Sequence, residues 1–430
     1  MLNTDSYRVV AIVAVALLGG CSVTEAPAAD AADNRYAVDF VVDLTAGADT
    51  ARVSVRTGAG ASRLRELSMS FDAGRLSNVA ADGALNMFDG RLNWSPPATG
   101  GTLSYSVAIT QRRGDGGFDA RFTDDWALFR GDDLFPPMRT RVAKGATSES
   151  RLLFKLPDNW GVVTPWRSDG GGIVFPFDNP DRDFDRPTGW MLAGRIGVRR
   201  TRVGDTRVAV AAPLGQSVRR MDIMAFLNWT LPAVVAVFPT MDPRLLIVSA
   251  DDPMWRGGLS GPGSLYMHAD RPLISENGTS TLLHELIHVA MGASGSRHDD
   301  WILEGMAEYY SIALLARTGT LSERRMHLAL GELAEWGENI TDLFAPESRG
   351  PMTARAAVLL AELDAELRME KPAGGGLDDV VAAMIDTQAD WTYDNLCRTA
   401  RNELGHAAKA LRPSQVPGAP RATACLASDE

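Results

Sequence analysis

The chain has 430 residues, of which 45% are hydrophobic and 23% charged, and its formal net charge is −11. This length predicts two or three domains with a sizeable hydrophobic core, and the composition excludes a disordered or collagen-like chain. Nucleic acid is not an expected partner, because binding to phosphates requires a positively charged surface and no basic block stands out.

An apolar segment at residues 9–20 (VVAIVAVALLGG) follows a single basic residue, Arg8. This segment is too short to span a bilayer, which requires about 20 residues, and is typical of a secretory signal peptide. It leads into the sequence LGGC, which resembles the bacterial lipobox and ends at Cys21. The resemblance implies that residues 1–20 are removed and that Cys21 becomes the lipidated first residue.

These features predict a lipid-anchored protein of a bacterial cell envelope, facing the periplasm. Ser22 follows the cysteine in place of the Asp that retains lipoproteins in the inner membrane, which favours the outer membrane in a Gram-negative source. Residues 21–35 are otherwise small, acidic and polar, and predict a flexible tether. The two other cysteines, Cys397 and Cys425, are candidates for one disulfide in such an oxidising compartment.

Between residues 36 and 212, short runs of alternating apolar and polar residues are separated by Gly, Asp and Pro clusters. Examples are AVDFVVDL, ARVSVRT and LSYSVAITQR. Alternation with a period of two is typical of antiparallel strands that bury one face. The pattern predicts an N-terminal antiparallel β-sandwich domain without helices.

Residues 213–412 have a mainly helical pattern. A first helix is expected over 216–238, broken or kinked at Pro232, and a buried strand over 244–250. Further helices are predicted at 279–291, 302–317, 322–337, 351–370, 377–387 and 391–411. The remaining residues, 413–430, are expected to form a loose tail. The predicted fold class is therefore α+β, with the β-sandwich followed by a mainly helical domain.

The helix predicted at 279–291 carries His284, Glu285 and His288 in the pattern H-E-x-x-H. Only six histidines occur in the chain, so a chance match to this pattern is rare. Residues four positions apart share one face of a helix, which allows both imidazoles to bind one metal ion. Two imidazoles and a carboxylate suit Zn²⁺ and leave a position for water. We therefore predict one Zn²⁺ per chain, with Glu285 as general base and acid.

Glu304 is the candidate third ligand. It lies in the helix predicted at 302–317, and a turn after His288 can bring this helix back across the first. Glu308 lies one helical turn further on. Its carboxylate is a candidate to accept a hydrogen bond from a ligating imidazole, which would orient the ring.

H-E-x-x-H followed by W-x-x-E-G-x-A-E-Y-Y at residues 301–310 resembles the gluzincin metallopeptidases. The similarity is strongest to the glycyl aminopeptidase family and more distant to the aminopeptidase N family. Weaker similarities lie at residues 135–137, 156–160, 356–368 and 377–380. The substrate strand of these families matches Gly257, Gly258, Leu259 and Ser260. The resemblance implies a thermolysin-like zinc domain that aligns a peptide or protein substrate along this edge strand.

Two positions depart from the family pattern. The Glu that binds the substrate's free α-amine is replaced by Ser260, which lacks the charge that anchors an ammonium. The Tyr that stabilises the oxyanion, three residues before a Gly, is replaced by Glu347, whose charge would repel it. The side chains considered as replacement donors are Tyr309, Tyr310, Tyr393, His298 and Arg349.

The sequence thus predicts a zinc-dependent metallopeptidase, and it leaves aminopeptidase and endopeptidase activity both open. The family resemblance favours an aminopeptidase, whereas Ser260 favours cleavage that ignores the peptide terminus. The alternative is a non-catalytic zinc-binding envelope lipoprotein, which the missing Tyr suggests and the intact Glu285 opposes. A hydrolase of a non-peptide amide or an epoxide is a further alternative.

Overall fold

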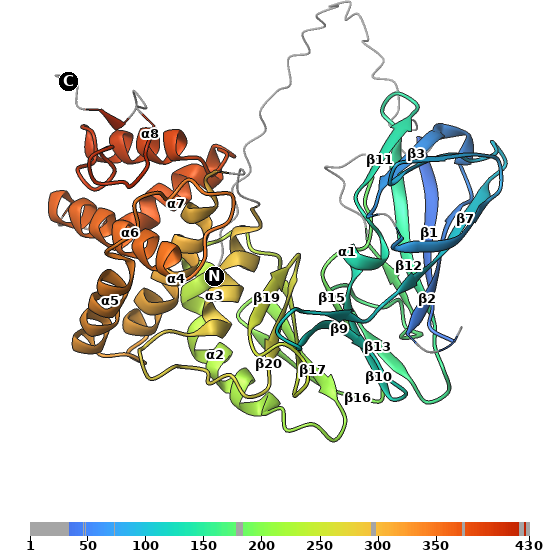
Figure 1. The fold of residues 1–430 in the computed structure, drawn as a ribbon, viewed down its shortest axis with the longest axis horizontal. Helices are drawn as coiled ribbons and strands as arrows, with labels where there is room; N and C mark the ends of the chain where they lie inside the picture. Colours follow the sequence, from blue (N-terminus) through green and yellow to red (C-terminus); the bar gives the residue numbers. More distant parts are fainter. Residues whose placement is uncertain are drawn as a thin grey trace, which may run out of the picture.

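The computed structural model describes residues 34–420 and 425–426, except 46, 48, 73, 178–183, 294–297 and 372–374. The expected signal segment, Cys21 and most of the expected tether lie outside the described residues. Figure 1 shows two parts side by side, a β-rich part from the N-terminal half and a helical part from the C-terminal half. The coarse prediction, a β domain followed by a mainly helical one, is therefore confirmed.

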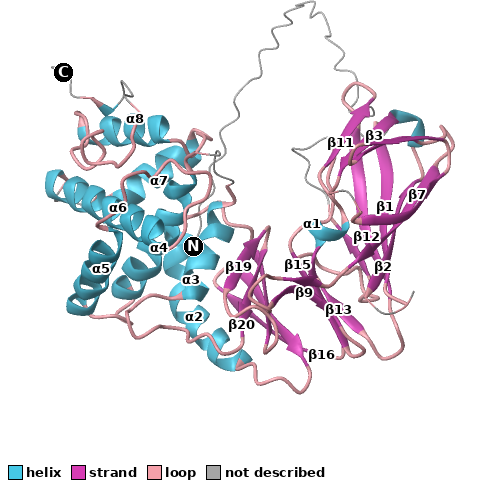
Figure 2. Ribbon diagram, viewed as in Figure 1, coloured by secondary structure: helices cyan, strands magenta, loops and turns pink. Residues whose placement is uncertain are grey.

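Three sheets form the N-terminal part (Figure 2). The first contains, in spatial order, β14 (Val174–Pro176), β12 (Thr147–Lys155), β1 (Arg35–Asp43), β2 (Thr50–Thr57), β7 (Gly101–Ala108) and β4 (Leu76–Ala81). The second contains β11 (Met138–Val142), β3 (Leu64–Ser70), β6 (Arg91–Ser95) and β5 (Ala84–Phe88). The third contains β13 (Gly161–Val163), β15 (Trp190–Gly194), β10 (Trp126–Arg130), β9 (Phe118–Phe122) and β8 (Gln111–Arg112).

Alternating apolar residues explain strands such as β2, in which Ala51, Val53 and Val55 are buried and the residues between them are polar. Two details differ from the prediction. Strands β1 and β12 pair in parallel, which the long stretch of chain between them allows, whereas a short hairpin would join only antiparallel strands. Two short helical elements, η1 (Ala61–Arg63) and α1 (Gly131–Leu134), also occur in this part.

A fourth sheet joins the N-terminal part to the helices. Its spatial order is β16 (Ile196–Val203), β17 (Thr206–Pro213), β18 (Arg244–Ala250), β20 (Ser264–His268) and β19 (Gly258–Gly261). Strands β17, β18 and β20 are parallel, and β19 runs antiparallel along the edge. The boundary expected between residues 212 and 213 would separate β17 from its partner β18. We therefore place the boundary at Arg195, between β15 and β16. The boundary expected from the sequence differs because alternation alone does not show which sheet a strand joins.

The two faces of this fourth sheet belong to different hydrophobic cores. Ile247 and Leu265 pack in the core of the helical part. Val248 and Tyr266 pack on the opposite side, against Trp190 of the N-terminal part. An apolar interface therefore fixes the edge strand β19 relative to both parts.

The helices of the C-terminal part are α2 (Arg220–Val237), α3 (Thr281–Met291), α4 (Asp300–Arg317), α5 (Glu323–Gly337), α6 (Pro351–Glu370), α7 (Leu377–Asp386) and α8 (Tyr393–Leu404). Each predicted helix is present, although α8 ends earlier than expected. Helix α2 is not broken at Pro232, where a break or a kink was expected, because buried residues on both sides hold it in the core. This helix is also long and apolar enough to cross a membrane by length and composition.

The C-terminal segment packs against the helices where it is described. Cys397 of α8 and Cys425 form a disulfide, with their Cα atoms 5.2 Å apart. Val416 is buried in the core, and the Leu343 amide donates to the Pro417 carbonyl at 3.0 Å. The expectation of a loose tail is therefore wrong for these residues, because an alanine- and proline-rich composition does not reveal a covalent anchor.

Candidate metal centre and its cleft

Helix α3 carries the H-E-x-x-H motif between two well-defined ends. The side chain of Ser280 accepts a hydrogen bond from the Leu283 amide and caps the first turn. Gly292 adopts a left-handed conformation with φ of 60° and ends the helix. Apolar residues between these ends are buried in the core, so His284 and His288 share the remaining face.

Donor atoms of three side chains converge at this face. The Nε2 atoms of His284 and His288 lie 3.2 Å apart. Glu304 reaches across from α4 and places its Oε2 atom 3.4 Å from the His284 Nε2 and its Oε1 atom 3.3 Å from the His288 Nε2. The predicted ligands, which come from two helices, are thus brought together.

The separations of these atoms fit a zinc ion. Tetrahedral zinc with bonds of about 2.0–2.1 Å holds its ligand atoms about 3.3 Å apart. The observed separations of 3.2, 3.3 and 3.4 Å are close to this value, with each imidazole nitrogen facing a different oxygen of Glu304. In addition, the Glu308 carboxylate lies 2.9 Å from the His284 Nδ1. A proton on Nδ1 would leave the Nε2 lone pair free for a metal.

A second group of possible metal ligands lies at the surface, formed by Glu366, Glu370 and His406. Its side chains are already engaged: the His406 Nε2 lies 2.8 Å from Glu370, and both oxygens of Glu366 accept hydrogen bonds from backbone amides. The first group is the stronger candidate, because its donor atoms face one another rather than other partners.

Glu285 lies between the candidate ligands and the edge strand β19. Its side chain is buried and accepts a hydrogen bond from the backbone N–H of Ser260. A Cβ atom on Gly258 would lie 2.7 Å from the Glu285 Cγ, so a glycine is needed for this approach. The carboxylate is therefore placed beside the ligands, where it can exchange a proton with a water.

Carboxylates outnumber imidazoles at this site. Burial raises the pKa of Glu285, although His284 and His288 act in the opposite direction. Burial alone would also raise the pKa of Glu304, but the same two imidazoles outweigh it and lower this pKa. Burial lowers the pKa of His284, yet Glu304 and Glu308 raise it well above its ordinary value. The excess of negative charge favours a divalent cation.

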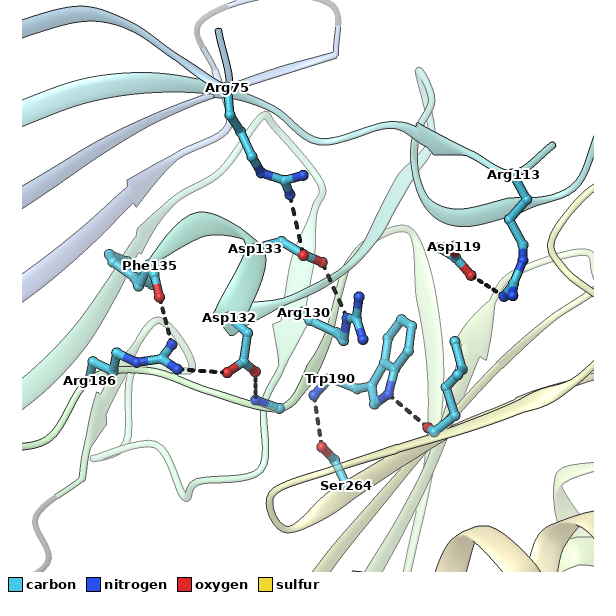
Figure 3. A network of polar contacts seen from close by, with 12 residues as sticks. Arg75, Arg113, Asp119, Arg130, Asp132, Asp133, Phe135, Arg186, Trp190 and Ser264 are labelled. Carbon is cyan, nitrogen blue, oxygen red and sulfur yellow. Dashed lines mark hydrogen bonds and ion pairs between the residues drawn. The ribbon is translucent and has the colours of Figure 1, made fainter. Parts of the chain in front are cut away.

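The N-terminal part supports the hairpin formed by β19 and β20 (Figure 3). The Trp190 indole N–H donates to the Leu259 carbonyl at 2.9 Å, and the Trp190 backbone N–H donates to the Ser264 hydroxyl at 2.7 Å. The Arg130 guanidinium lies over the Trp190 ring and pairs with Asp133. Sequence reasoning missed Trp190, because nothing local links it to a strand that lies 69 residues later in the chain.

A cleft of about 1100 Å³ lies beside the candidate ligands, between the two parts of the molecule. His288 and the end of α3 form one wall, and residues 260–263 of the β19–β20 hairpin form another. Asp132 and Arg186 line the cleft from the N-terminal part. The predicted substrate strand therefore borders both the candidate metal ligands and an open space.

The three tyrosines considered as oxyanion donors have other partners. The Tyr309 hydroxyl donates to Asp364 at 2.5 Å, and the Tyr310 hydroxyl donates to Asp378 at 2.9 Å. The Tyr393 hydroxyl donates to a backbone carbonyl at 2.6 Å, and burial raises its pKa to about 12. These contacts give the three tyrosines a packing role.

The two remaining donor candidates also have other partners. The His298 Nδ1 lies 3.0 Å from the Phe344 carbonyl. Arg349 forms an exposed ion pair with Glu347, the residue that stands at the family's Tyr position. In the described part of the chain, no hydrogen bond or ion pair joins these five side chains to the candidate ligands.

Comparison with solved structures identifies the fold. A crystal structure of an aminopeptidase N family protein from Idiomarina loihiensis matches with a TM-score of 0.63 and 16% identity, covering 89% of this chain and 74% of that one. An M1 zinc metallopeptidase from Deinococcus radiodurans matches with a TM-score of 0.58 and 15% identity, covering 90% of this chain and 94% of that one. The chain therefore has the two-part fold of these metallopeptidases.

A further structure shows such an enzyme with a peptide. It is a mutant M1 zinc metallopeptidase from Deinococcus radiodurans bound to a Tyr-Ser-Ala substrate, with a TM-score of 0.59 and 16% identity. The match covers 91% of this chain and 96% of the chain in that structure. Comparison with family models and with curated proteins finds no match.

Proposed function

We propose that this protein is a zinc-dependent metallopeptidase in which His284, His288 and Glu304 bind one Zn²⁺. The observation that carries the proposal is the convergence of these side chains: the two Nε2 atoms lie 3.2 Å apart, and each lies 3.3–3.4 Å from one of the two Glu304 oxygens. These separations suit tetrahedral zinc, and they occur on a fold shared with M1 zinc metallopeptidases.

The residues around the ligands supply the remaining chemistry. Zinc, when bound, would lower the pKa of a water to about 7 and polarise the scissile carbonyl. Glu285 takes a proton from the attacking water and delivers it to the leaving amine. Glu308 keeps the His284 ring in the tautomer that presents Nε2. The Ser260 N–H, which contacts Glu285, keeps the edge strand beside the reacting atoms.

Zinc analysis combined with peptide digestion tests this proposal. We expect the purified protein to contain one zinc per chain and to cleave a peptide library. Glu285→Gln should keep the zinc and lose cleavage, because only the proton carrier changes. His288→Ala should lose both. Cleavage that survives in Glu285→Gln, or zinc that survives in His288→Ala, would refute the assignment.

A non-catalytic zinc-binding lipoprotein is the second candidate. The observation in its favour is that Glu347 stands at the family's Tyr position and the five replacement donors have other partners. This candidate predicts one zinc per chain with no cleavage of any peptide, so the same experiment separates the two functions.

We also propose that the chain is anchored by lipid at Cys21, in the bacterial cell envelope and facing the periplasm. The lipobox-like LGGC after an apolar segment supports this proposal. Radiolabelled palmitate should be incorporated into the wild-type protein and not into Cys21→Ser. Equal labelling of both proteins, or of neither, would contradict lipidation at this residue.

A further inference from the structure

A second cavity lies beside the cleft, at the junction of the two parts. Its volume is about 550 Å³, within the range of pockets that hold small molecules. One wall is the segment at residues 162–168, which begins in β13, together with Phe175 of β14. The other wall is formed by residues of β16, β17 and β18, which lie at the same junction (Figure 1). A ligand in this cavity would therefore contact both parts.

Four arginines line this cavity, and among the described lining residues there is no carboxylate. They are Arg167, Arg200, Arg207 and Arg244. Arg244 is engaged by Asp242, to which its guanidinium donates two hydrogen bonds of 3.1 Å each. In the described part of the chain, no hydrogen bond or ion pair joins the side chains of the other three arginines to another group. The cavity thus gathers uncompensated positive charge in a chain whose net charge is −11.

The carboxylates closest in the chain to these arginines do not neutralise them. Asp205, in the turn between β16 and β17, accepts a hydrogen bond from Arg202 at 2.8 Å. Asp169 borders a neighbouring hollow together with Arg167, but no ion pair joins the two side chains. An anion that enters the cavity would therefore meet free guanidinium groups.

The register of the fourth sheet explains why the arginines gather. Arg200 of β16 lies opposite Ala209 of β17, and Arg207 of β17 lies opposite Arg244 of β18. Paired residues share one face of a sheet, as do residues two positions apart. Ala209 packs against the small core that the sheet shares with the N-terminal part. The sheet therefore presents these arginines on the face that is turned toward the N-terminal part.

Apolar side chains form the floor of the cavity. Val163, Phe175 and Leu246 are buried, and Trp166 and Ala209 are half-buried beside them. The three unpaired arginines, in contrast, are exposed. Charge therefore surrounds the mouth of the cavity, and apolar surface lies beneath it. A ligand that covers this floor removes apolar surface from water, which favours binding.

The combination of charge and floor defines the chemistry of a ligand. Guanidinium groups bind carboxylates and phosphates through paired N–H donors. We propose that the cavity binds a small amphiphilic anion, which is a hydrocarbon body that carries one carboxylate or phosphate. The body covers the apolar floor, and the head group pairs with Arg200 and Arg207. None of the three unpaired arginines lines the cleft beside the metal ligands, so this inference does not depend on the proposed peptidase function.

Calorimetric titration of the purified protein with sodium octanoate tests the proposal. We expect one octanoate per chain, and octyl phosphate should bind at least as tightly. Octanol, which lacks the charge, and acetate, which lacks the body, should each bind at least tenfold more weakly. Each CH₂ group added between butyrate and octanoate should lower Kd by about two- to fourfold. A Kd for octanol or for acetate equal to that for octanoate would overturn the proposal.

Two arginine variants locate the binding site. Arg200→Gln and Arg207→Gln should each raise the Kd for octanoate by about tenfold, because each removes charge-assisted hydrogen bonds. Arg199→Gln is the matched control, since Arg199 is also exposed in β16 but lies opposite Val210 and does not line the cavity. Its Kd should equal that of the wild type. Equal Kd values in all four proteins would place octanoate elsewhere, such as at the metal ligands, and would overturn the proposal.

Vesicles distinguish a soluble amphiphile from a membrane lipid, since a lipid head group offers the same anionic chemistry. A phospholipid in a bilayer keeps its chains in the membrane and does not cover the cavity floor. Vesicles of phosphatidylglycerol should therefore affect octanoate binding no more than vesicles of phosphatidylcholine, which control for uptake of octanoate by the membrane. Competition by phosphatidylglycerol alone would overturn the proposal of a soluble ligand.

Discussion

Glu308 illustrates at the residue scale how a side chain that does not touch the metal supports the site. Its carboxylate lies 2.9 Å from the His284 Nδ1 and fixes the tautomer of the ring. We expect Glu308→Gln to weaken zinc binding by about 10–100-fold, as loss of such a partner does in other zinc sites. Competition with a chelator measures the affinity. Glu332→Gln, at an exposed position of α5, should bind zinc like the wild type, and equal affinities in all three proteins would contradict this role.

Gly258 is a second position at the residue scale, because an added Cβ atom there would collide with helix α3. A Cβ there would lie 2.7 Å from the Glu285 Cγ and the Thr281 Cγ2, so Gly258→Ala must push the carboxylate or the strand aside. A displacement of about 1 Å costs on the order of 100-fold in rate, so we expect this loss in kcat/KM with zinc retained.

Gly331→Ala is the matched control for Gly258→Ala. An added Cβ at Gly331 meets nothing within 4 Å, and the residue lies in α5. This substitution should leave kcat/KM unchanged and raise stability by up to about 1 kcal/mol, because alanine favours a helix. Equal activity of both alanine variants would show that β19 does not press on Glu285 in the active protein.

At the element scale, Asp364 joins three helices. From α6 it accepts hydrogen bonds from Tyr309 of α4 at 2.5 Å, from Arg368 at 2.8 Å and from the Leu377 amide of α7 at 2.7 Å. Burial alone would raise the pKa of Asp364, but these hydrogen bonds outweigh burial and lower it below its ordinary value of 3.8. The charged carboxylate is therefore more stable in the folded protein.

The sign of the pH dependence follows from this lowered pKa. The stabilisation by Asp364 is fully present above the ordinary value and is lost as the pH falls below it toward the folded pKa. Asp364→Asn should reduce the free energy of unfolding by about 1.5–3 kcal/mol at pH 7, because hydrogen bonds to a charged group are lost. The difference should shrink below pH ~4. Urea unfolding at both pH values measures it, and a difference that grows in acid would contradict this account.

Local patterns predicted the elements better than their pairing. The Ser280 cap, the Gly292 terminus and the helix bounds depend on neighbouring residues, which the sequence displays. The parallel pairing of β1 with β12 and the place of β17 in the fourth sheet depend on residues far apart in the chain. Alternation marks a strand as half-buried but does not identify its partner.

At the scale of the whole molecule, Trp190 links the N-terminal part to the edge strand β19. It is fully buried, and its indole N–H donates to the Leu259 carbonyl. Trp190→Phe keeps most of the apolar surface but removes this hydrogen bond. We expect a loss of stability of about 1–2 kcal/mol and a higher KM, because β19 loses its support from the N-terminal part.

Trp229→Phe is the control for Trp190→Phe. Trp229 also donates its indole N–H to a backbone carbonyl, that of Thr318, but its side chain is exposed. Its replacement should change stability by less than about 0.5 kcal/mol and leave KM unchanged. Urea unfolding and steady-state kinetics provide both readouts. A similar KM in all three proteins would show that the interface does not position β19.

The same distinction of scale explains what the sequence could predict about the site. Spacing within one helix predicted His284, Glu285 and His288, and the next helix supplied Glu304. The pairing of Asp132 with Arg186 and of Trp190 with Leu259 joins segments separated by 54 and 69 positions. Motif spacing does not predict contacts between residues so far apart in the chain, so the pairing of charges in the cleft could be found only in the structure.

Anomalous X-ray diffraction at the zinc edge, from crystals of the protein as purified, tests the central claim most directly. The account predicts one strong peak within about 2.0–2.2 Å of the His284 Nε2, the His288 Nε2 and a Glu304 oxygen. A zinc peak at the surface group of Glu366, Glu370 and His406 alone, or no zinc at either group, would contradict it.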